Sequence, residues 1–370
     1  MKKKVIHIQK LAGVGGAEKH LGILLPGLVA EGLEIHYLVI EPKSWKDINE
    51  PFLQTLAQQG VHIHRLQLLD PIGVLNIPKL KTLLDSYPII HSHLIHGDLW
   101  ASLLKKKGQQ LISTKHGYDE KYQSKWGLNP EYLNNHKNIY QWICRQVIPA
   151  EDKIICISQG LKNIFIALGA EPHKIKLIHY GYTIPTNYPE RKSPEYWLFL
   201  SRLIPFKRPD LLADTYIQYR KSGGKLPLYL AGDGILKSAL QKQFQVAGLN
   251  KEVHFLGRLP DPIPLLSKAA GLIITSTSEG FGLVALEAMA AGIPVLGFDV
   301  PAINESVVSD RNGYLVPFPN TDLLSQALLK TENKNLREQL GDAGRNRVST
   351  IFSTQKMISE TLELYSSLRP

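Results

Sequence analysis

The sequence of 370 residues has little cysteine and no long hydrophobic run. Its two cysteines, Cys144 and Cys156, are too few for a disulfide framework and lack zinc-site spacing, which fits a reducing compartment. No stretch reaches the roughly 18 apolar residues of a membrane-spanning helix. The apolar run near Met1 ends at Lys10, too early for a signal peptide. We therefore expect a cytoplasmic protein that is not integral to a membrane.

Acidic residues are too few to balance the basic ones, and the net charge is +10. A basic chain favours phosphates, acidic lipid surfaces or nucleic acid as partners. The sequence contains no basic zipper, zinc finger or RNA-stacking motif, so we expect no nucleic-acid partner.

The length and the pattern of elements predict two α/β domains, because single hydrophobic cores stop growing at roughly 250 to 300 residues. Short β-rich runs alternate with helical patterns, which is typical of parallel sheets. A polar segment at 183–194 interrupts the alternation. We expect domains at 1–185 and 195–350 and a final helix at 351–370. The strand predictions are 4–9, 34–41, 62–66, 89–91, 111–114, 153–157, 176–179, 196–201, 228–231, 254–256, 272–275 and 294–297.

A glycine turn, residues 13–18, follows the first predicted strand and precedes a helix. Glycines there let backbone amides approach a phosphate, although a plain strand-to-helix turn fits as well. The turn also resembles a dinucleotide fingerprint, with Glu41 as the ribose acid of an NAD-dependent enzyme. Glu18 stands where that fingerprint has Gly or Ala, and a carboxylate there would oppose a pyrophosphate.

Two segments of the second half carry residues suited to binding a diphosphate and a ribose. Arg202 and Lys207 follow a predicted strand, where cations can hold a diphosphate. The segment 279–295 places Glu279 before a glycine turn and Glu287 about two turns inside an apolar helix. Hydrogen bonds from a ribose diol would account for a carboxylate in such surroundings.

These segments resemble the GT4 family of retaining GT-B glycosyltransferases, with its Glu-x7-Glu motif. The resemblance implies two Rossmann-like domains facing each other across a cleft, with the C-terminal helix crossing back to the N-terminal domain. The N-terminal domain would bind the acceptor and the C-terminal domain the donor. The matching segments are 13–18, 91–93, 114–117, 157–158, 202–207, 231–234, 253–257, 279–295 and 313–316.

The resemblance also assigns roles to individual residues. Arg202 and Lys207 would hold the donor diphosphate, Glu287 the ribose and Glu279 the transferred sugar, with His116 near the reacting centre. The catalytic set is thus His116, Glu279, Arg202 and Lys207. The other donor-binding residues would be Gly15, Gly16, Gly232, Gly257, Arg258, Phe281, Gly282 and Leu283.

The chain departs from the family pattern in two places. Arg208 stands where many relatives have Gly, and the segment 300–305 is a shortened match to a glycine-rich turn. The histidines 91, 93, 96 and 116 raise the question of a metal site, but the family does not depend on a metal. We predict neither a metal nor a cofactor, since the nucleotide sugar is a substrate.

The sequence thus predicts transfer of a hexosyl unit from a nucleotide sugar, preferably UDP-linked, to a hydroxyl acceptor such as a lipid-linked or cell-surface glycan precursor. The alternatives are a UDP-sugar epimerase of GT-B fold, an NAD-dependent oxidoreductase and a non-catalytic nucleotide-sugar-binding protein. Lysines interleaved with aromatic residues between Lys105 and Trp142 add a further expectation, peripheral contact with an anionic membrane. The residues of that segment are Lys105, Lys106, Lys107, Lys115, Lys121 and Lys125 with Tyr118, Tyr122, Trp126, Tyr140 and Trp142.

Overall fold

The computed structural model describes residues 3–70, 74–185, 195–259 and 261–368, which divide into two compact units. The first unit comprises Met1–Asp119, Asn129–Gly181 and Thr354–Pro370. The second comprises Glu120–Leu128 and Tyr182–Ser353. The short segment Glu120–Leu128 therefore groups with the second unit, a placement that the sequence pattern does not indicate. Most of the predicted linker, residues 186–194, lies outside the described residues.

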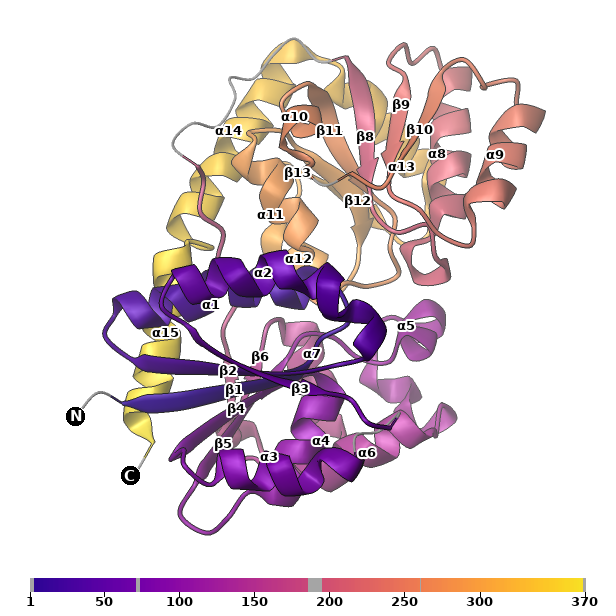
Figure 1. Ribbon diagram of the computed structural model, residues 1–370. Coiled ribbons are helices and arrows are strands. Elements are labelled where there is room, and N and C mark those ends of the chain that lie inside the picture. The colour runs from indigo at the N-terminus through magenta and orange to yellow at the C-terminus, as the bar shows by residue number, and fades with distance from the viewer. Residues whose placement is uncertain (1–2, 71–73, 186–194, 260, 369–370) are drawn as a thin grey trace. The chain divides into compact units, whose positions relative to one another are not determined.

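The described part of the first unit contains a seven-stranded parallel sheet in the order β3-β2-β1-β4-β5-β6-β7 (Figure 1). The order reverses between β1 and β4, which pair with His7 opposite His91. Such a reversal is the hallmark of a Rossmann-like sheet. The strands are β1 Lys4–Lys10, β2 Glu34–Glu41, β3 His62–Gln67, β4 Ile89–His93, β5 Gln110–Lys115, β6 Lys153–Cys156 and β7 Ile175–Leu177.

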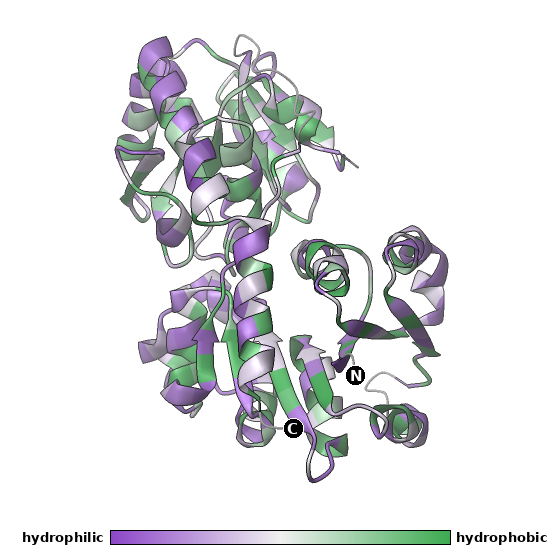
Figure 2. Ribbon diagram, turned by 90° about the vertical axis from the view of Figure 1, so that its left-hand side faces the viewer, coloured by the Kyte–Doolittle hydropathy of each residue, from purple (hydrophilic) through white to green (hydrophobic). Residues whose placement is uncertain are grey.

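Alternate residues of these strands face two different hydrophobic layers, as the period of a β-strand requires. Val5 and Val39 belong to a cluster with residues of α1, α2 and α15, whereas Ile6 and Ile8 belong to a cluster with α3 and α4. Figure 2 shows hydrophobic residues on several of the strands. The helices are α1 Gly16–Ala30, α2 Lys46–Gln58, α3 Ile77–Leu84, α4 Leu94–Leu104, α6 Ile139–Val147, α7 Gln159–Ala167 and α15 Thr354–Ser367.

The C-terminal helix α15 is part of the first unit's core, as expected. Its residues Met357, Ile358, Leu364 and Tyr365 are buried in the cluster that α1 also lines. The last helix of the chain therefore completes the domain that the first strand begins.

The second unit contains, within the described residues, a six-stranded parallel sheet in the order β10-β9-β8-β11-β12-β13. Its order reverses between β8 and β11. The strands are β8 Tyr196–Leu200, β9 Leu228–Ala231, β10 Val253–Gly257, β11 Ala269–Ile274, β12 Val295–Asp299 and β13 Gly313–Pro317. The helices are α5 Glu120–Trp126, α8 Pro209–Lys221, α9 Lys237–Val246, α10 Ile263–Leu266, α11 Leu283–Ala290, α12 Ile303–Ser306, α13 Thr321–Thr331 and α14 Lys334–Thr350.

The expected fold class, two Rossmann-like α/β sheets with the C-terminal helix returning to the first, is confirmed. Across the described ranges, no helix is both long and apolar enough to cross a membrane.

Candidate active site

The second sheet brings Lys207 and Glu279 together at its reversal point. Lys207 follows β8 and Glu279 follows β11, and these two strands are neighbours. Open parallel sheets bind ligands at the carboxyl ends of the strands where the order reverses. The two residues are 72 positions apart in sequence, yet Lys207 Nζ lies 2.5 Å from Glu279 Oε1 and 2.6 Å from Oε2.

The Lys207–Glu279 ion pair is largely withdrawn from solvent. The exposed fractions of the two side chains are 12% and 10%. Ser276 Oγ donates a further hydrogen bond of 2.7 Å to Glu279 Oε1. Lys207 Nζ also lies 4.7 Å from the centre of the Phe206 ring. These contacts hold the Lys207 ammonium group in one position at the end of β8.

The loop after β11 is fastened to the loop after β8. Thr275 Oγ1 donates to the carbonyl oxygens of Lys207 and Arg208, both at 2.9 Å. The backbone amide of Thr277 donates to the Phe206 carbonyl, also at 2.9 Å. These bonds fix the backbone on both sides of the ion pair and so define its geometry.

The buried Gln123 of α5 joins this arrangement, which the sequence does not suggest. Thr277 Oγ1 donates to the Gln123 carbonyl at 2.7 Å, and Ser278 Oγ donates to Gln123 Oε1 at 3.0 Å. The same helix provides Glu120, whose Oε1 accepts a hydrogen bond of 2.7 Å from Arg202 Nη2. Only spatial structure could reveal these contacts, because Glu120 lies 82 residues before Arg202 in the chain.

Arg202 is more exposed than Lys207, with 54% of its side chain in solvent. Its guanidinium carbon lies 5.7 Å from the centre of the Phe206 ring. An exposed ion pair contributes only about 0–1 kcal/mol, so the Glu120 contact leaves Arg202 able to exchange partners.

The N-terminal end of α11 carries the predicted glycine turn. Gly282 caps the helix at φ +82°, and a side chain there would meet Ile303 Cδ1 at 2.7 Å. Phe281 is buried against Phe352, while Leu283 begins the helix. Backbone amides at a helix start have no partner within the helix and favour anions.

Glu287 lies in the interior of α11, with only 7% of its surface exposed. Burial of Tyr182 raises the pKa of its hydroxyl to about 12, and the charges of Glu287 and Asp261 contribute to the rise. The sequence expectation that this carboxylate lies inside an apolar helix agrees with its burial.

Gly232 and Gly257 lie at the ends of the two neighbouring strands β9 and β10. Gly232 has φ +144°, and a Cβ there would lie 1.9 Å from the Ser201 carbonyl oxygen, so only glycine fits. Its amide donates to the Gly257 carbonyl at 2.7 Å. Arg258 comes next and is exposed.

Arg208 adopts the conformation expected of the glycine that many relatives carry. Its φ of +48° and ψ of +53° lie in the left-handed region, which costs a non-glycine residue roughly 1–2 kcal/mol. An ion pair of 2.6 Å with Asp210 holds the side chain. The backbone turn is thus kept without glycine.

In the first unit, Gly15 and Gly16 begin α1. The Gly15 amide donates to Glu18 Oε2 at 2.8 Å. Glu18 therefore occupies one of the backbone amides that the sequence suggested for a phosphate. Burial raises the pKa of Glu18, and hydrogen bonds from Gly15, its own amide and Gln9 counter the rise. A Cβ added to Gly16 would meet no atom within 4 Å, so the surroundings of this glycine are open.

Glu41, the candidate ribose acid of an NAD-dependent enzyme, is engaged within the protein. Arg65 Nε donates to its Oε1 at 2.7 Å, and Asn49 Nδ2 donates to its Oε2 at 2.8 Å. Glu41 is 4% exposed. The carboxylate thus has a structural role, which weakens the oxidoreductase alternative.

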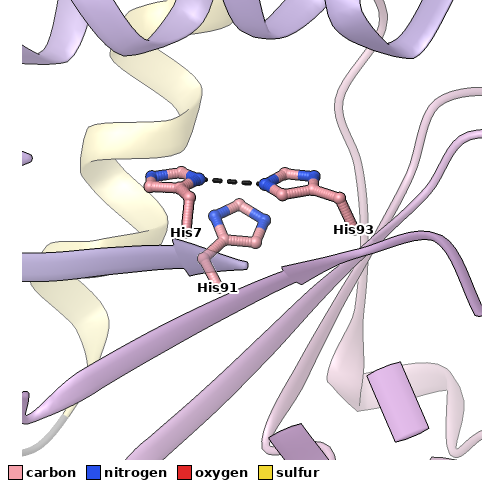
Figure 3. Close-up of side chains that lie close together, drawn as sticks. All are labelled: His7, His91 and His93. Carbon is pink, nitrogen blue, oxygen red and sulfur yellow. Dashed lines mark hydrogen bonds between the residues drawn. The ribbon is translucent and has the colours of Figure 1, made fainter. Parts of the chain in front are cut away.

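His116 is tied into a group of buried histidines, three of which Figure 3 shows. Its Nε2 lies 2.9 Å from His93 Nδ1 and its Nδ1 lies 2.7 Å from the Tyr180 hydroxyl. His7 and His91 adjoin His93, and the three offer ligand atoms within 4.8 Å of one another. His96 is separate and contacts Lys10. His7 is not part of any motif in the sequence, and its one signal there is a histidine within the apolar run of the first strand.

Three residues of the segment predicted to touch a membrane are buried, and that part of the interpretation is wrong. Lys115 Nζ forms ion pairs of 2.8 Å with Asp98 and 2.6 Å with Glu151, both also buried. Tyr118 and Tyr122 are 5% and 0% exposed. None of the three can reach a lipid surface.

Family models match nearly the whole chain. The model for glycosyl transferases group 1 matches residues 183–347, and the model for Glycosyltransferase Family 4 matches residues 14–184. An uncharacterized glycosyltransferase of Methanocaldococcus jannaschii is 27% identical over 96% of this chain and 95% of its own length. The poly(ribitol-phosphate) alpha-N-acetylglucosaminyltransferase of Staphylococcus aureus is 28% identical over 45% of this chain and 34% of its own length.

Solved structures share the fold. The Anabaena protein HepE, whose structure was solved in complex with UDP-glucose, has a TM-score of 0.80 at 21% identity. The match covers 99% of this chain and 100% of HepE. Together with the two sheets and the family models, this likeness shows that the chain is a glycosyltransferase of the GT4 family with the GT-B fold.

Proposed function

We propose that the protein transfers a hexosyl unit from a UDP-sugar to a hydroxyl acceptor, with retention at the anomeric carbon. The observation that carries the proposal is the Lys207–Glu279 pair, held at the reversal point of the second sheet beside the start of α11. The choice of UDP follows the complex of HepE with UDP-glucose.

In this proposal, Lys207 and Arg202 stabilise the charge on the departing diphosphate. The amides of Gly282 and Leu283 add positive potential from the start of α11. Positive charge contributes most to catalysis when it lies where negative charge develops in the transition state. Binding of the diphosphate would draw Lys207 away from Glu279, which keeps its hydrogen bond from Ser276.

The freed carboxylate of Glu279 would then accept hydrogen bonds from the hydroxyls of the transferred sugar, and Glu287 would accept them from the ribose. The bond between the anomeric carbon and the diphosphate oxygen breaks while the acceptor oxygen bonds on the same face. The acceptor proton passes to the leaving diphosphate. The products are UDP and a glycoside, and no carboxylate nucleophile takes part, unlike in retaining hydrolases.

The proposed donor site also includes Gly232 after β9, and Gly257 and Arg258 at the end of β10. Gly15 and Gly16 of the first unit complete the proposed set. Phe281 would act by presenting its backbone while its ring anchors the turn against Phe352. His116 is proposed to lie near the reacting sugar.

A screen of nucleotide sugars tests the donor assignment. UDP-, GDP- and ADP-sugars are each measured for thermal stabilisation and for nucleotide release, and products from the successful donor are identified by mass spectrometry. We expect UDP-sugars to stabilise the protein and to release UDP. Interconversion of UDP-sugars without an acceptor would indicate an epimerase, and binding without any release would indicate a non-catalytic protein.

We also propose a cytoplasmic location with peripheral contact at an anionic membrane, for which Trp142 of the predicted segment and the nearby Ile139 remain exposed. Cys144 and Cys156 are buried free thiols, which fits a reducing compartment. Ile139 and Trp142 of α6 are 70% and 57% exposed. Aromatic side chains favour the headgroup layer. Co-flotation with anionic vesicles at low and raised salt tests the contact, and no binding at low salt would exclude it.

A further inference from the structure

Three histidines of the first unit, His7, His93 and His116, form a continuous series of hydrogen bonds that leads on to Tyr180. His7 Nδ1 lies 2.9 Å from His93 Nε2, and His93 Nδ1 lies 2.9 Å from His116 Nε2. His116 Nδ1 lies 2.7 Å from the Tyr180 hydroxyl. Each histidine uses its Nδ1 to contact the next residue in the series, so the three rings are linked in the same order of atoms.

The series extends backwards through α15. The Tyr365 hydroxyl lies 3.3 Å from His7 Nε2 and 2.6 Å from His91 Nδ1. His91 Nε2 in turn lies 2.7 Å from Thr114 Oγ1. Residues of β1, β4, β5 and α15 are thereby connected, and all of them belong to the first unit.

The rings of His7 and His93 meet edge to edge, as Figure 3 shows. Their planes differ by 7° and their centres are 5.2 Å apart, while the facing nitrogens are 2.9 Å apart. The centres of His93 and His116 are also 5.2 Å apart. In both links the nitrogens lie between the two rings, which is the arrangement of an N–H···N hydrogen bond.

The same geometry does not suit a metal ion among His7, His91 and His93. Two imidazole nitrogens bound to one tetrahedral zinc at about 2.0–2.1 Å are separated by about 3.3 Å, with both lone pairs aimed at the ion. Here the facing nitrogens are 2.9 Å apart and point at each other. A proton fits between them and an ion does not.

Neutral imidazoles that are linked in such a series must all have the same tautomer. Burial is the main cause that lowers the pKa of His7 to about 3 and places the pKa values of His91, His93 and His116 well below the usual value. Each ring then carries a single N–H. If one ring changed its tautomer alone, two N–H groups or two lone pairs would face each other.

We propose that this histidine array, His91, Tyr365, His7, His93 and Tyr180, sets the tautomer and orientation of His116. Both ring nitrogens of His116 are engaged by the array, so the ring is fixed before any substrate binds. His7, His91, His93 and Tyr365 are thus positioning residues. Their effect on sugar transfer depends on the proposed function, whereas the array itself does not.

Nuclear magnetic resonance of protein labelled with ¹⁵N in histidine tests the array without any substrate. We expect couplings through the hydrogen bonds between His7 Nδ1 and His93 Nε2 and between His93 Nδ1 and His116 Nε2. We also expect one and the same tautomer at all three rings. Mixed tautomers at His116, or the absence of both couplings, would overturn the proposal.

Two substitutions and a matched control separate positioning from folding. His93→Phe should remove both couplings and leave His116 with two tautomers. Tyr365→Phe keeps the ring that packs in the core but removes the hydroxyl that contacts His7 and His91. The couplings between His7 and His93 and between His93 and His116 should remain. The control is His64→Phe, because His64 Nε2 pairs with His36 Nδ1 at 2.9 Å in the same sheet but outside the array. It should leave His116 unchanged.

Kinetics then measure the consequence for catalysis. His93→Phe should lower kcat by about tenfold to hundredfold with little change in the KM for the donor, because misplaced catalytic groups lower the rate more than binding. Unchanged kcat with a disturbed His116 tautomer would overturn the positioning role alone. Zinc chloride should affect the melting temperature of the wild type and of His93→Phe equally. A rise in the wild type only would make the cluster a metal site and contradict the array.

Discussion

At the scale of single residues, Lys207 and Arg202 should matter for the chemical step. We predict that Lys207→Ala and Arg202→Ala each lower kcat by roughly 10² or more, because each removes a positive charge that stabilises the negative charge developing on the departing diphosphate. Lys268→Ala is a suitable control, since Lys268 forms an ion pair of 3.1 Å with Glu195 away from both loops. Steady-state nucleotide release gives the rates. Folded variants with wild-type turnover would refute the diphosphate assignment.

The two glutamates should separate into binding and rate effects. Glu287→Gln is expected to weaken UDP affinity by about tenfold or more, because hydrogen bonds to charged groups contribute about 1.5–3 kcal/mol. Glu279→Gln should lower kcat without weakening UDP affinity, since the proposed contact of Glu279 is with the sugar that UDP lacks and its charge competes with the diphosphate for Lys207. Titration calorimetry with UDP measures both. Equal UDP affinity in the wild type and in Glu287→Gln would contradict the ribose contact.

At the scale of elements, the turn between the 3₁₀ segment Pro205–Lys207 and α8 holds Arg208 in a left-handed conformation. We predict that Arg208→Gly preserves or raises stability, whereas Arg208→Ala lowers it by about 1 kcal/mol, because alanine keeps the backbone strain and loses the ion pair with Asp210. Urea denaturation compares the two variants. A less stable glycine variant than alanine variant would show that the turn is not strained.

Most strands could be predicted from the sequence because their hydrophobic runs are short and bounded by glycine or polar residues. The predictions 34–41 and 228–231 coincide with β2 and β9. β13, Gly313–Pro317, is marked in the sequence only by a family motif, since a five-residue run ending in proline is a weak strand signal. The grouping of Glu120–Leu128 with the second unit could not be predicted, because it depends on contacts such as Gln123 with Thr277.

The candidate site could likewise be predicted only in part from the sequence. The Glu-x7-Glu spacing places Glu279 and Glu287 around the start of a helix, as α11 has them. The sequence could not show that Lys207 and Glu279 form an ion pair, since they follow different strands. The histidine array could not be predicted either, because its residues are far apart in sequence. Strand pairing and α15 bring His7, His91 and Tyr365 together.

At the scale of the whole molecule, buried neutral histidines should make the first unit sensitive to acid. Burial lowers the pKa of His7 and His20 to about 3, so the unfolded chain binds more protons than the folded one below about pH 6.5. Stability should therefore fall as the pH falls from 6.5 towards 3, by up to about 1.4 kcal/mol per pH unit for each ring.

Urea unfolding at several pH values between 5 and 7.5 measures this dependence. Substitution of His20 by Gln should reduce its slope, while substitution of the exposed His173, 70% of whose side chain lies in solvent, should not. A midpoint that stays constant from pH 7.5 to 5 would contradict the neutral, buried state of the rings.

The most direct test of the central claim uses water as a slow acceptor, so that no acceptor need be known. Proton nuclear magnetic resonance follows the protein with a UDP-α-hexose that stabilises it and reports the anomer of the sugar released first. The account predicts release of UDP with the α-anomer appearing before the β-anomer, at a rate that falls by roughly 10² in Lys207→Ala. Initial release of the β-anomer, or equal rates in the two proteins, would contradict it.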